Sequence, residues 1–348
     1  MEESIALELK ESNNVNHILN TQKDMYLKYK EVNTNYGILT GISSIDWYEN
    51  GNIKECQADE EIVLNTPAGK LIPGYSYEGV RNKYIKSLAF YENGNIKKIA
   101  LNEQTFVDTL SGTFPAELVT FYESGNVKRV FPLNGKITGY WTEENEFELA
   151  VPIQIKLSFA EFERKIISIH FYESGMFKSI TFWPKELLSF RYANVVYGVR
   201  YGISFYAAGN IRTLEPAYPM RVKTPIGEIT AFDVNAIGIN GDVNSLQFDE
   251  DGSVRSLVSS TDIFSVTDKT TDSENKKYII KPGLRQSMSH EEAMDIISVY
   301  IEFKDRKVIF KSEEYYEFDI SYWDIKISNN AFLPVSKCSS CAGCNGCI

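Results

Sequence analysis

Most of the chain consists of short runs in which apolar residues alternate with polar ones or stand together, and glycine-centred turns separate these runs. Runs such as IKSLAF, AELVTF, IISIHF and YGISF are rich in β-branched and aromatic residues, which favours strands over helices. The pattern predicts a mainly β protein made of repeated antiparallel β-hairpins.

One nine-residue phrase, called the hairpin phrase below, recurs six times and always contains a glycine. Every copy also carries a Lys or Arg three residues after that glycine. The copies are WYENGNIKE from Trp47, FYENGNIKK from Phe90, FYESGNVKR from Phe121, FYESGMFKS from Phe171, FYAAGNIRT from Phe205 and FDEDGSVRS from Phe248.

The hairpin phrase predicts a tight turn between two strands. Asn50-Gly51 and Asn93-Gly94 favour a two-residue primed turn, because both residues tolerate positive φ. Copies with Ser, Ala or Asp before the glycine favour three-residue loops with the glycine in the left-handed region. Apolar positions three apart, as in Ile96-Lys97-Lys98-Ile99, break strict alternation and indicate either a bulge after the turn or a sheet covered on both faces.

A second motif accompanies two of the phrases. TPAGKLIPGYSYEG begins at Thr66 and TPIGEITAFDVNAIG at Thr224, each 24 residues before the next phrase, and a looser version, FPLNGKITGYW, begins at Phe131. The repeating unit is thus a phrase hairpin followed by a second strand pair. Stacked units would form an extended sheet or solenoid-like array over residues 37–265.

The phrases from Phe90 and Phe121, and the stretch that ends at Gly135-Lys136-Ile137-Thr138-Gly139, resemble the MORN-variant repeat of the YwqK family. The resemblance covers about residues 40–260. It implies a β-hairpin array used for interaction, with an antitoxin-like binding role as the function attached to that family.

The two ends of the chain differ from the array. Residues 1–36 are polar, and 15–31 favour a helix. The capping box Ser289-His290-Glu291-Glu292 predicts a helix near 290–297, and the polar stretch 267–277 predicts a linker or a long hairpin tip. Two strands around Lys304-Asp305-Arg306 and a third in EYYEFDI predict a β-rich cap over 278–335, which would cover the edge of the array.

Charge and hydropathy restrict the partners. The net charge of −11 with no Lys/Arg stripe argues against nucleic acid and against an anionic membrane surface. The acidic start MEESIALELKESNN lacks the features of a secretory signal, and no apolar run reaches the length of a membrane span. These features predict a cytoplasmic protein that engages another protein rather than nucleic acid or membrane.

No catalytic residue is predicted. His17 and His290 lie outside the array, and His170 occupies a strand position that predicts a surface site, because other copies place Ala, Thr or Ser there. Glu143-Glu144 and Glu313-Glu314 are sequence neighbours that would face opposite sides of strands, as solvated charge. Neither a dinucleotide fingerprint nor a phosphate loop occurs. We therefore expect a protein that is not an enzyme.

The last residues, 336–348, form a cysteine-rich tail, predicted to be flexible. The candidate metal ligands are Cys338, Cys341, Cys344 and Cys347. Thiolates select zinc, copper(I) or iron–sulfur clusters, and the first three cysteines fit the Cys-x2-Cys-x2-Cys run that supplies three ligands of one four-iron cluster in ferredoxin-type sequences. A [4Fe-4S] cluster is the leading interpretation, with zinc, redox-active or modified thiols and an unoccupied tail as alternatives. Cys56 is either a distant further ligand or a small residue of the first repeat.

Together these features predict a non-enzymatic repeat scaffold that binds a protein partner and carries a metal at its C-terminus. Two alternatives stay open: an electron-transfer or thiol-redox partner of an enzyme complex, and an antitoxin-like binding protein. The recurring Lys or Arg is either a binding strip for an acidic partner or a device that keeps edge strands soluble.

Overall fold

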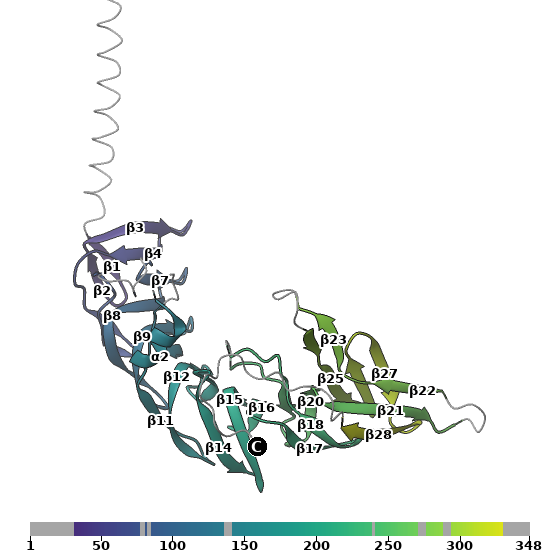
Figure 1. The fold of residues 1–348 in the computed structure, drawn as a ribbon. Helices are drawn as coiled ribbons and strands as arrows, with labels where there is room; N and C mark the ends of the chain where they lie inside the picture. Colours follow the sequence, from purple (N-terminus) through teal and green to yellow (C-terminus); the bar gives the residue numbers. More distant parts are fainter. Residues whose placement is uncertain are drawn as a thin grey trace, which may run out of the picture. The chain divides into compact units, whose positions relative to one another are not determined.

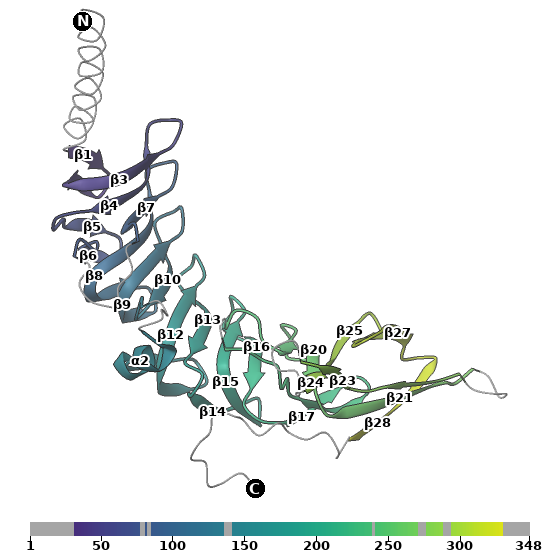
Figure 2. The same cartoon turned by 45° about the horizontal axis from the view of Figure 1, so that its top comes forward.

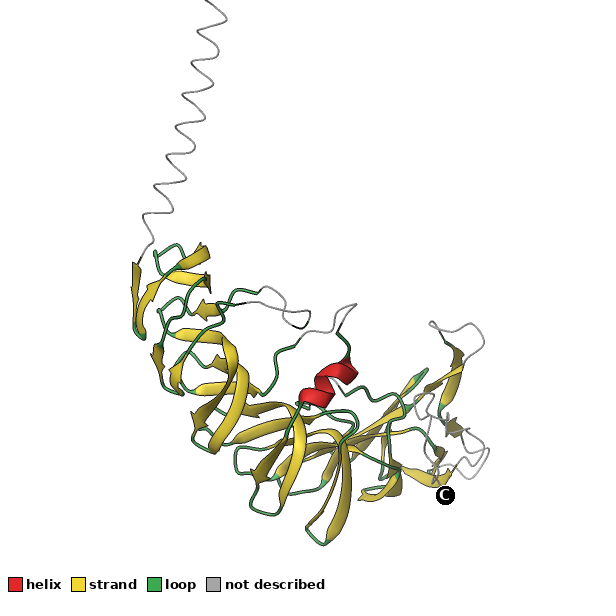
Figure 3. Cartoon of the chain, turned by 60° about the vertical axis from the view of Figure 1, so that its left-hand side comes forward, coloured by secondary structure: helices red, strands yellow, loops and turns green. Residues whose placement is uncertain are grey.

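The computed structural model describes residues 31–76, 81, 85–135, 141–238, 241–270, 276–287 and 294–329. Strands dominate this part of the chain, and their ladders are antiparallel, as the sequence predicts. Its one helix is α2 (Glu143–Leu149), drawn in red in Figure 3. The chain divides into two compact units, Met1–Ile153 with Lys165–Phe177 and Gln154–Arg164 with Lys178–Ile348.

The first unit contains a ladder of phrase hairpins, and the tips of β3–β4, β7–β8 and β9–β10 lie in a row in Figure 2. Its strands, in order of pairing, are β3 (Ile42–Trp47), β4 (Ile53–Ala58), β7 (Leu88–Phe90), β8 (Ile96–Thr109), β9 (Gly112–Phe121), β10 (Val127–Phe131) and β12 (Glu161–Phe171). Two short hairpins accompany the ladder, namely β1 (Glu31–Thr34) with β2 (Gly37–Thr40) and β5 (Leu64–Thr66) with β6 (Gly69–Leu71).

The second unit continues the same design (Figure 1). Its ladder contains β13 (Phe177–Phe182), β14 (Leu187–Tyr192), β15 (Val195–Phe205), β16 (Ile211–Pro216), β19 (Leu246–Phe248), β20 (Val254–Ser259), β25 (Val299–Lys304), β26 (Lys307–Lys311) and β27 (Tyr315–Asp319). The remaining strands are β11 (Pro152–Lys156), the pair β17 (Met220–Thr224) and β18 (Gly227–Ala231), the trio β22 (Lys277–Ile280), β21 (Asp262–Asp268) and β28 (Trp323–Asn329), and the pair β23 (Gly283–Gln286) and β24 (Met294–Ile297).

All six hairpin phrases close with the same three-residue loop. In each, the glycine N–H donates to the carbonyl three residues earlier at 2.8–3.0 Å, and the glycine φ lies between +83° and +96°. The two-residue primed turn predicted for Asn50-Gly51 and Asn93-Gly94 is therefore wrong. The side chain of Asn50 accepts the N–H of Asn52 at 2.9 Å, and this local bond favours a type I turn followed by a left-handed glycine.

The Lys or Arg of the phrase occupies a β-bulge. In the second copy Phe90 pairs with Ile96 and Ala89 pairs with Lys98, which leaves Lys97 as the extra residue. The same register shift occurs in four other copies. The bulge turns the apolar residues three apart to the same buried side, so the predicted bulge is confirmed.

In most copies the bulged cation packs on the tyrosine of its own hairpin. The distances from cation to ring centroid are 5.8 Å for Lys54 and Tyr48, 5.5 Å for Lys97 and Tyr91, 5.4 Å for Lys128 and Tyr122, and 5.9 Å for Arg212 and Tyr206. The last copy has Asp249 in place of the tyrosine, and there Arg255 Nε donates to Asp249 Oδ1 at 2.7 Å. The cation thus contributes a contact within its own hairpin.

In four copies the same tyrosine joins its hairpin to the next one along the chain. Its hydroxyl donates to the backbone carbonyl of the next copy's first aromatic residue, from Tyr48 to Phe90 at 3.0 Å, Tyr91 to Phe121 at 2.8 Å, Tyr122 to Phe171 at 2.8 Å and Tyr206 to Phe248 at 2.7 Å. The asparagine after the glycine makes a parallel bond, as Asn95 Nδ2 does to Glu123 O at 2.8 Å. The phrase therefore encodes both a turn and its link to a neighbour.

A second hairpin type has the sequence Thr-x-x-Gly. The threonine Oγ1 donates to the glycine carbonyl at 2.7–2.8 Å, and it accepts the N–H of the residue before the glycine at 3.1–3.3 Å. The hairpins expected at Thr66 and Thr224 are confirmed as β5–β6 and β17–β18, and Thr34 and Thr109 begin two more that were not predicted. Residues 136–140 of the looser motif from Phe131 lie outside the described residues.

The core of both units consists of the first aromatic residue and the apolar residues that flank each turn. Phe90, Phe121, Phe171 and Phe205 are at most 2% exposed, whereas Trp47 at the first copy is 37% exposed. Burial of one such phenylalanine contributes about 2 kcal/mol. The buried phenylalanines pack on adjacent hairpins as well as their own, as Phe171 does on Phe114 and Phe177, which is why isolated copies would not be stable.

Several predictions for the ends need correction. Residues 31–34, placed in the N-terminal segment, form β1, and residues 294–297, predicted as helix, form β24 paired with β23. The capping-box residues 289–292 lie outside the described residues. Thr267 pairs with Lys277 in β21–β22, so the two ends of the polar stretch 267–277 lie side by side, while its residues 271–275 lie outside the described residues. The three strands after residue 298 are confirmed as β25, β26 and β27.

Candidate functional site

Four predicted ligands and two histidines lie outside the described residues. These are Cys338, Cys341, Cys344, Cys347, His17 and His290. In the part of the chain that is described, no group of three or more His, Cys, Asp or Glu side chains is placed to hold a metal ion. Cys56 is fully buried in β4, and burial raises the pKa of its thiol to about 12, with smaller effects of Lys86, which lowers the pKa, and of Asp59, which raises it. It is therefore a poor nucleophile and a core residue.

The expectation that His170 is a surface residue is wrong. The side chain is 6% exposed, and its Nδ1 lies 2.7 Å from Nη2 of Arg129, the residue opposite it in the β10–β12 pair. The His170 side chain is buried because β12, in which it lies, pairs with β10. The small residues at the same position of other copies did not indicate how deeply this position is buried. His170 belongs to the packing of the sheet.

A buried ion cluster ties the loops of the first unit together. Arg81 donates to Glu117 at 2.7 and 3.0 Å and to Glu146 at 2.7 and 2.8 Å. Glu146 also accepts from Trp141 Nε1 and from the backbone of Gly135. Burial raises the pKa of Glu146, but the hydrogen bonds from Arg81 and Trp141 outweigh it, so the pKa is lowered overall. Glu146 thus accepts four hydrogen bonds and Glu117 accepts three, two from Arg81 and one from Asn134 N, which indicates a structural role.

Glu146 lies in α2, together with Glu143 and Glu144, the acidic pair predicted from the sequence to lie on a strand as solvated charge. The helix begins with a capping box between Thr142 and Asn145, with Thr142 N donating to Asn145 Oδ1 at 3.0 Å. The neighbouring Glu143 and Glu144 are exposed, as predicted, although on a helix rather than a strand. Three acidic residues in the first turn favour this short helix.

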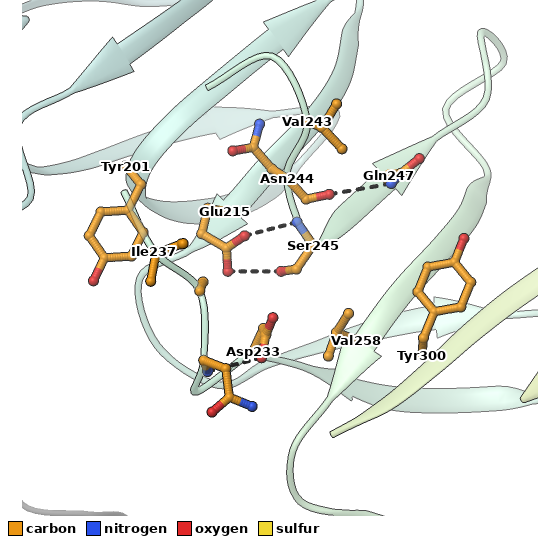
Figure 4. A pocket seen from close by; sticks show the side chains of 12 residues that line it. Tyr201, Glu215, Asp233, Ile237, Val243, Asn244, Ser245, Gln247, Val258 and Tyr300 are labelled. Atoms are coloured by element: carbon orange, nitrogen blue, oxygen red, sulfur yellow. Dashed lines mark hydrogen bonds between the residues drawn. The ribbon is translucent and has the colours of Figure 1, made fainter. Parts of the chain in front are cut away.

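The strongest candidate site is a pocket of about 290 Å³ in the second unit (Figure 4). Its floor comes from β15, β16, β19, β20 and β25, and the loop after β18 supplies the rest. The lining residues are Tyr201, Glu215, Asp233, Asn235, Ala236, Ile237, Val243, Asn244, Ser245, Gln247, Val258 and Tyr300. Tyr201 and Tyr300 stand on opposite sides of Glu215 and Ser245 in Figure 4.

Glu215 is the buried acid of this pocket, at 4% exposure. Ser245 donates to it twice, from its N–H to Oε2 and from its hydroxyl to Oε1, both at 2.8 Å. Arg200 Nη2 lies 3.8 Å from Oε1 and donates to the carbonyl of Asp233 at 2.6 Å. Burial raises the pKa of Glu215, although Ser245 and Arg200 act in the opposite direction.

A bulge in β15 directs Tyr201 to the pocket. The pairing with β16 shifts between Arg200 and Ile203, and Tyr201 has a φ of +59°, a left-handed conformation that is costly for a large side chain. A Cβ on Gly238 would lie 2.4 Å from Cδ1 of Tyr201, and one on Gly202 would lie 2.3 Å from Gly241 Cα. Strain of this kind is concentrated at functional sites.

The rim of the pocket is apolar and exposed. Ile237 is 75% exposed and Val243 is 70% exposed, so both sides of the opening present branched aliphatic side chains to solvent. The pocket can therefore hold the aliphatic part of a ligand at its mouth and a polar group at its floor. It lies at the lower end of the volumes typical of ligand sites, large enough for one long side chain.

None of the pocket residues was predicted from the sequence. The signals present were the long loop AFDVNAIGINGDVNS between a Thr-x-x-Gly hairpin and the next phrase, and the Tyr-Gly pair that interrupts the strand VRYGISF. Loops of this length inside a regular array are often functional.

Comparison with protein-family models, with curated proteins and with solved structures finds no match to this chain. Within the described residues, no helix is long and apolar enough to cross a bilayer.

Proposed function

We propose that this chain is a non-enzymatic scaffold that binds a protein partner through the second unit, at the pocket beside Tyr201 and Glu215. The observation that carries the proposal is the exposed apolar rim, Ile237 and Val243, around a polar floor. Exposed aliphatic side chains next to a concave site are typical of surfaces that contact another protein.

The hairpin array suits this role. In the second unit Tyr206 donates to the Phe248 carbonyl, Asn210 donates to the Glu250 carbonyl and Arg212 packs on Tyr206, so these groups stiffen the hairpins that carry the pocket. A rigid site loses little conformational entropy on binding, which favours affinity. The resemblance to MORN-variant repeats supports the same conclusion for the hairpin phrase.

The cysteine-rich tail is proposed as a separate metal-binding segment. Cys338, Cys341, Cys344 and Cys347 supply four thiolates for a [4Fe-4S] cluster or zinc. Anaerobic purification followed by metal analysis and a visible spectrum tests this part, with a chain ending at residue 335 as the control. Protein without iron, zinc or copper above that control contradicts it.

The binding role is tested by affinity capture from the source cells with quantitative mass spectrometry. Wild type is compared with a variant carrying Ile237→Ser and Val243→Ser, with a chain that ends at residue 335, and with Val63→Ser as a matched surface control in the first unit. We expect a protein that is enriched by wild type, by the truncated chain and by the control, and lost with the rim variant. Equal recovery with the rim variant would refute the assignment of the site.

A further inference from the structure

The electrostatics of the pocket point to the chemistry of its occupant. Two carboxylates, Glu215 and Asp233, are among its described lining residues, and none of those residues is basic. Arg200 lies behind the wall, where it contacts Glu215 and donates to the Asp233 carbonyl, so it offsets part of this charge without filling the pocket. The whole chain is also acidic, with a net charge of −11.

The buried carboxylate can accept more hydrogen bonds. Each oxygen of Glu215 receives one bond from Ser245, and a carboxylate has about four acceptor positions. Burial has already removed most of its contact with water, so a cation that reaches it meets a group with little hydration to lose. Electrostatic attraction at such a site is stronger than at the open surface.

The shape of the site fits a long basic side chain. Tyr201 lies beside Glu215 and provides an aromatic ring, and cations favour ring faces, whereas Tyr300 lies beyond Val258, where Lys311 Nζ is 5.0 Å from its ring centroid. Arg200 shows this preference in the same region, with its guanidinium 4.8 Å from the ring centroid of Tyr201. At the mouth, Ile237 and Val243 match the methylene stem of such a side chain, whose charged end then extends inward.

From this arrangement we infer that the pocket binds an arginine side chain of the protein partner, with the guanidinium at Glu215 and next to the ring of Tyr201. This inference rests on the proposed binding role and names the group that the site recognises. The planar guanidinium combines stacking on aromatic rings with hydrogen bonds to carboxylates, which a lysine ammonium does less well.

The test uses the full chain and two small probes, Nα-acetyl-argininamide and its uncharged analogue Nα-acetyl-citrullinamide. Ligand-observed NMR titrations give a Kd for each. Ile237 is exposed at the mouth of the pocket, so Ile237→Glu and Ile237→Lys change the charge there with little effect on folding. Val63→Lys, at a residue that is 48% exposed in the first unit, serves as the matched control.

We expect argininamide to bind about 10-fold or more tightly than citrullinamide, because a buried carboxylate discriminates charge. Ile237→Glu should tighten its Kd by roughly 3-fold and Ile237→Lys should weaken it by a similar factor, while Val63→Lys leaves it unchanged. Equal binding of both probes, or a Kd independent of the charge at residue 237, would overturn the inference. If a captured partner is lost with the rim variant while the probes fail to discriminate, the binding role stands and the arginine assignment falls.

Discussion

The glycine of the hairpin phrase provides a matched pair of substitutions that isolates the contact between the two hairpin types. Gly175 and Gly51 have nearly the same φ, +84° and +85°. A Cβ on Gly175 would lie 2.5 Å from Cβ of Leu110 in a Thr-x-x-Gly tip, whereas one on Gly51 would meet no atom within 4 Å. Both alanine variants therefore place an alanine in a left-handed conformation, and only Gly175→Ala also brings its Cβ into overlap with Leu110.

The magnitudes follow from these distances. A left-handed alanine costs about 1 kcal/mol, and this is the whole effect expected for Gly51→Ala. In Gly175→Ala the overlap involves a Cβ rather than a flexible side-chain end, so the tip must move and about 2 kcal/mol is added. Ser111 Oγ donates to Gly175 O at 2.7 Å, and this bond would also be strained.

Hydrogen exchange measured by mass spectrometry reports both local free energies. Peptides covering 171–177 should exchange roughly 100-fold faster in Gly175→Ala, and those covering 47–54 about 5-fold faster in Gly51→Ala, both relative to wild type. Leu110→Gly removes the opposing Cβ, so adding it to Gly175→Ala should bring exchange in 171–177 close to the roughly 5-fold effect expected for Gly51→Ala. Equal effects of the two alanine variants, or no rescue, would refute the claim that the tip packs on this turn.

Three further predictions concern single side chains. Tyr122→Phe removes the hydroxyl that donates to Phe171 at 2.8 Å and should destabilise the first unit by about 1 kcal/mol in urea denaturation. The pKa of Glu146 is lowered from its usual 4.5, so its bonds with Arg81 should stabilise the fold above that pH and be lost as the pH falls below it; Glu146→Gln should remove this step from the curve of stability against pH. Cys56, whose pKa is raised to about 12, should not react with a thiol reagent at pH 8 in a native chain ending at residue 335.

Each of these has its own control. Tyr315→Phe changes a tyrosine that is 59% exposed and should leave stability within about 0.5 kcal/mol. The exposed Glu144→Gln should keep the acid step that Glu146→Gln removes. Reaction of the thiol in native protein at the rate seen in urea would show that Cys56 is accessible and that the packing of β4 is described incorrectly.

Local patterns were predictable from the sequence because their causes are local. The hairpin phrase, its bulge and the three-residue loop depend on residues within one turn, so Gly125 and Lys128 could be interpreted without their neighbours. At Asn50-Gly51 and Asn93-Gly94 the two-residue primed turn was predicted where the three-residue loop forms, although both turns depend only on local residues. The hairpins at Thr34 and Thr109 were missed because the two residues between threonine and glycine do not include the proline that follows Thr66.

The candidate site depends on contacts that sequence spacing does not reveal. Glu215 and Ser245 are 30 residues apart, and their two hydrogen bonds form only once the loop after β18 closes over β16. His170 shows the same limit, because its depth follows from the pairing of β10 with β12. β24 was mistaken for a helix since its pairing with β23 outweighs local propensity.

The central claim is that each hairpin phrase is one module stabilised by its neighbours. Measuring how a substitution in one hairpin changes hydrogen exchange in the adjacent hairpins tests this claim most directly. Phe121→Ala removes a fully buried ring from the third copy, and hydrogen exchange can then be followed in each hairpin of the first unit. The account predicts faster exchange in the copies from Phe90 and Phe171 as well as in the substituted one, with the smallest change at the first copy. Faster exchange confined to residues 112–131 would contradict it.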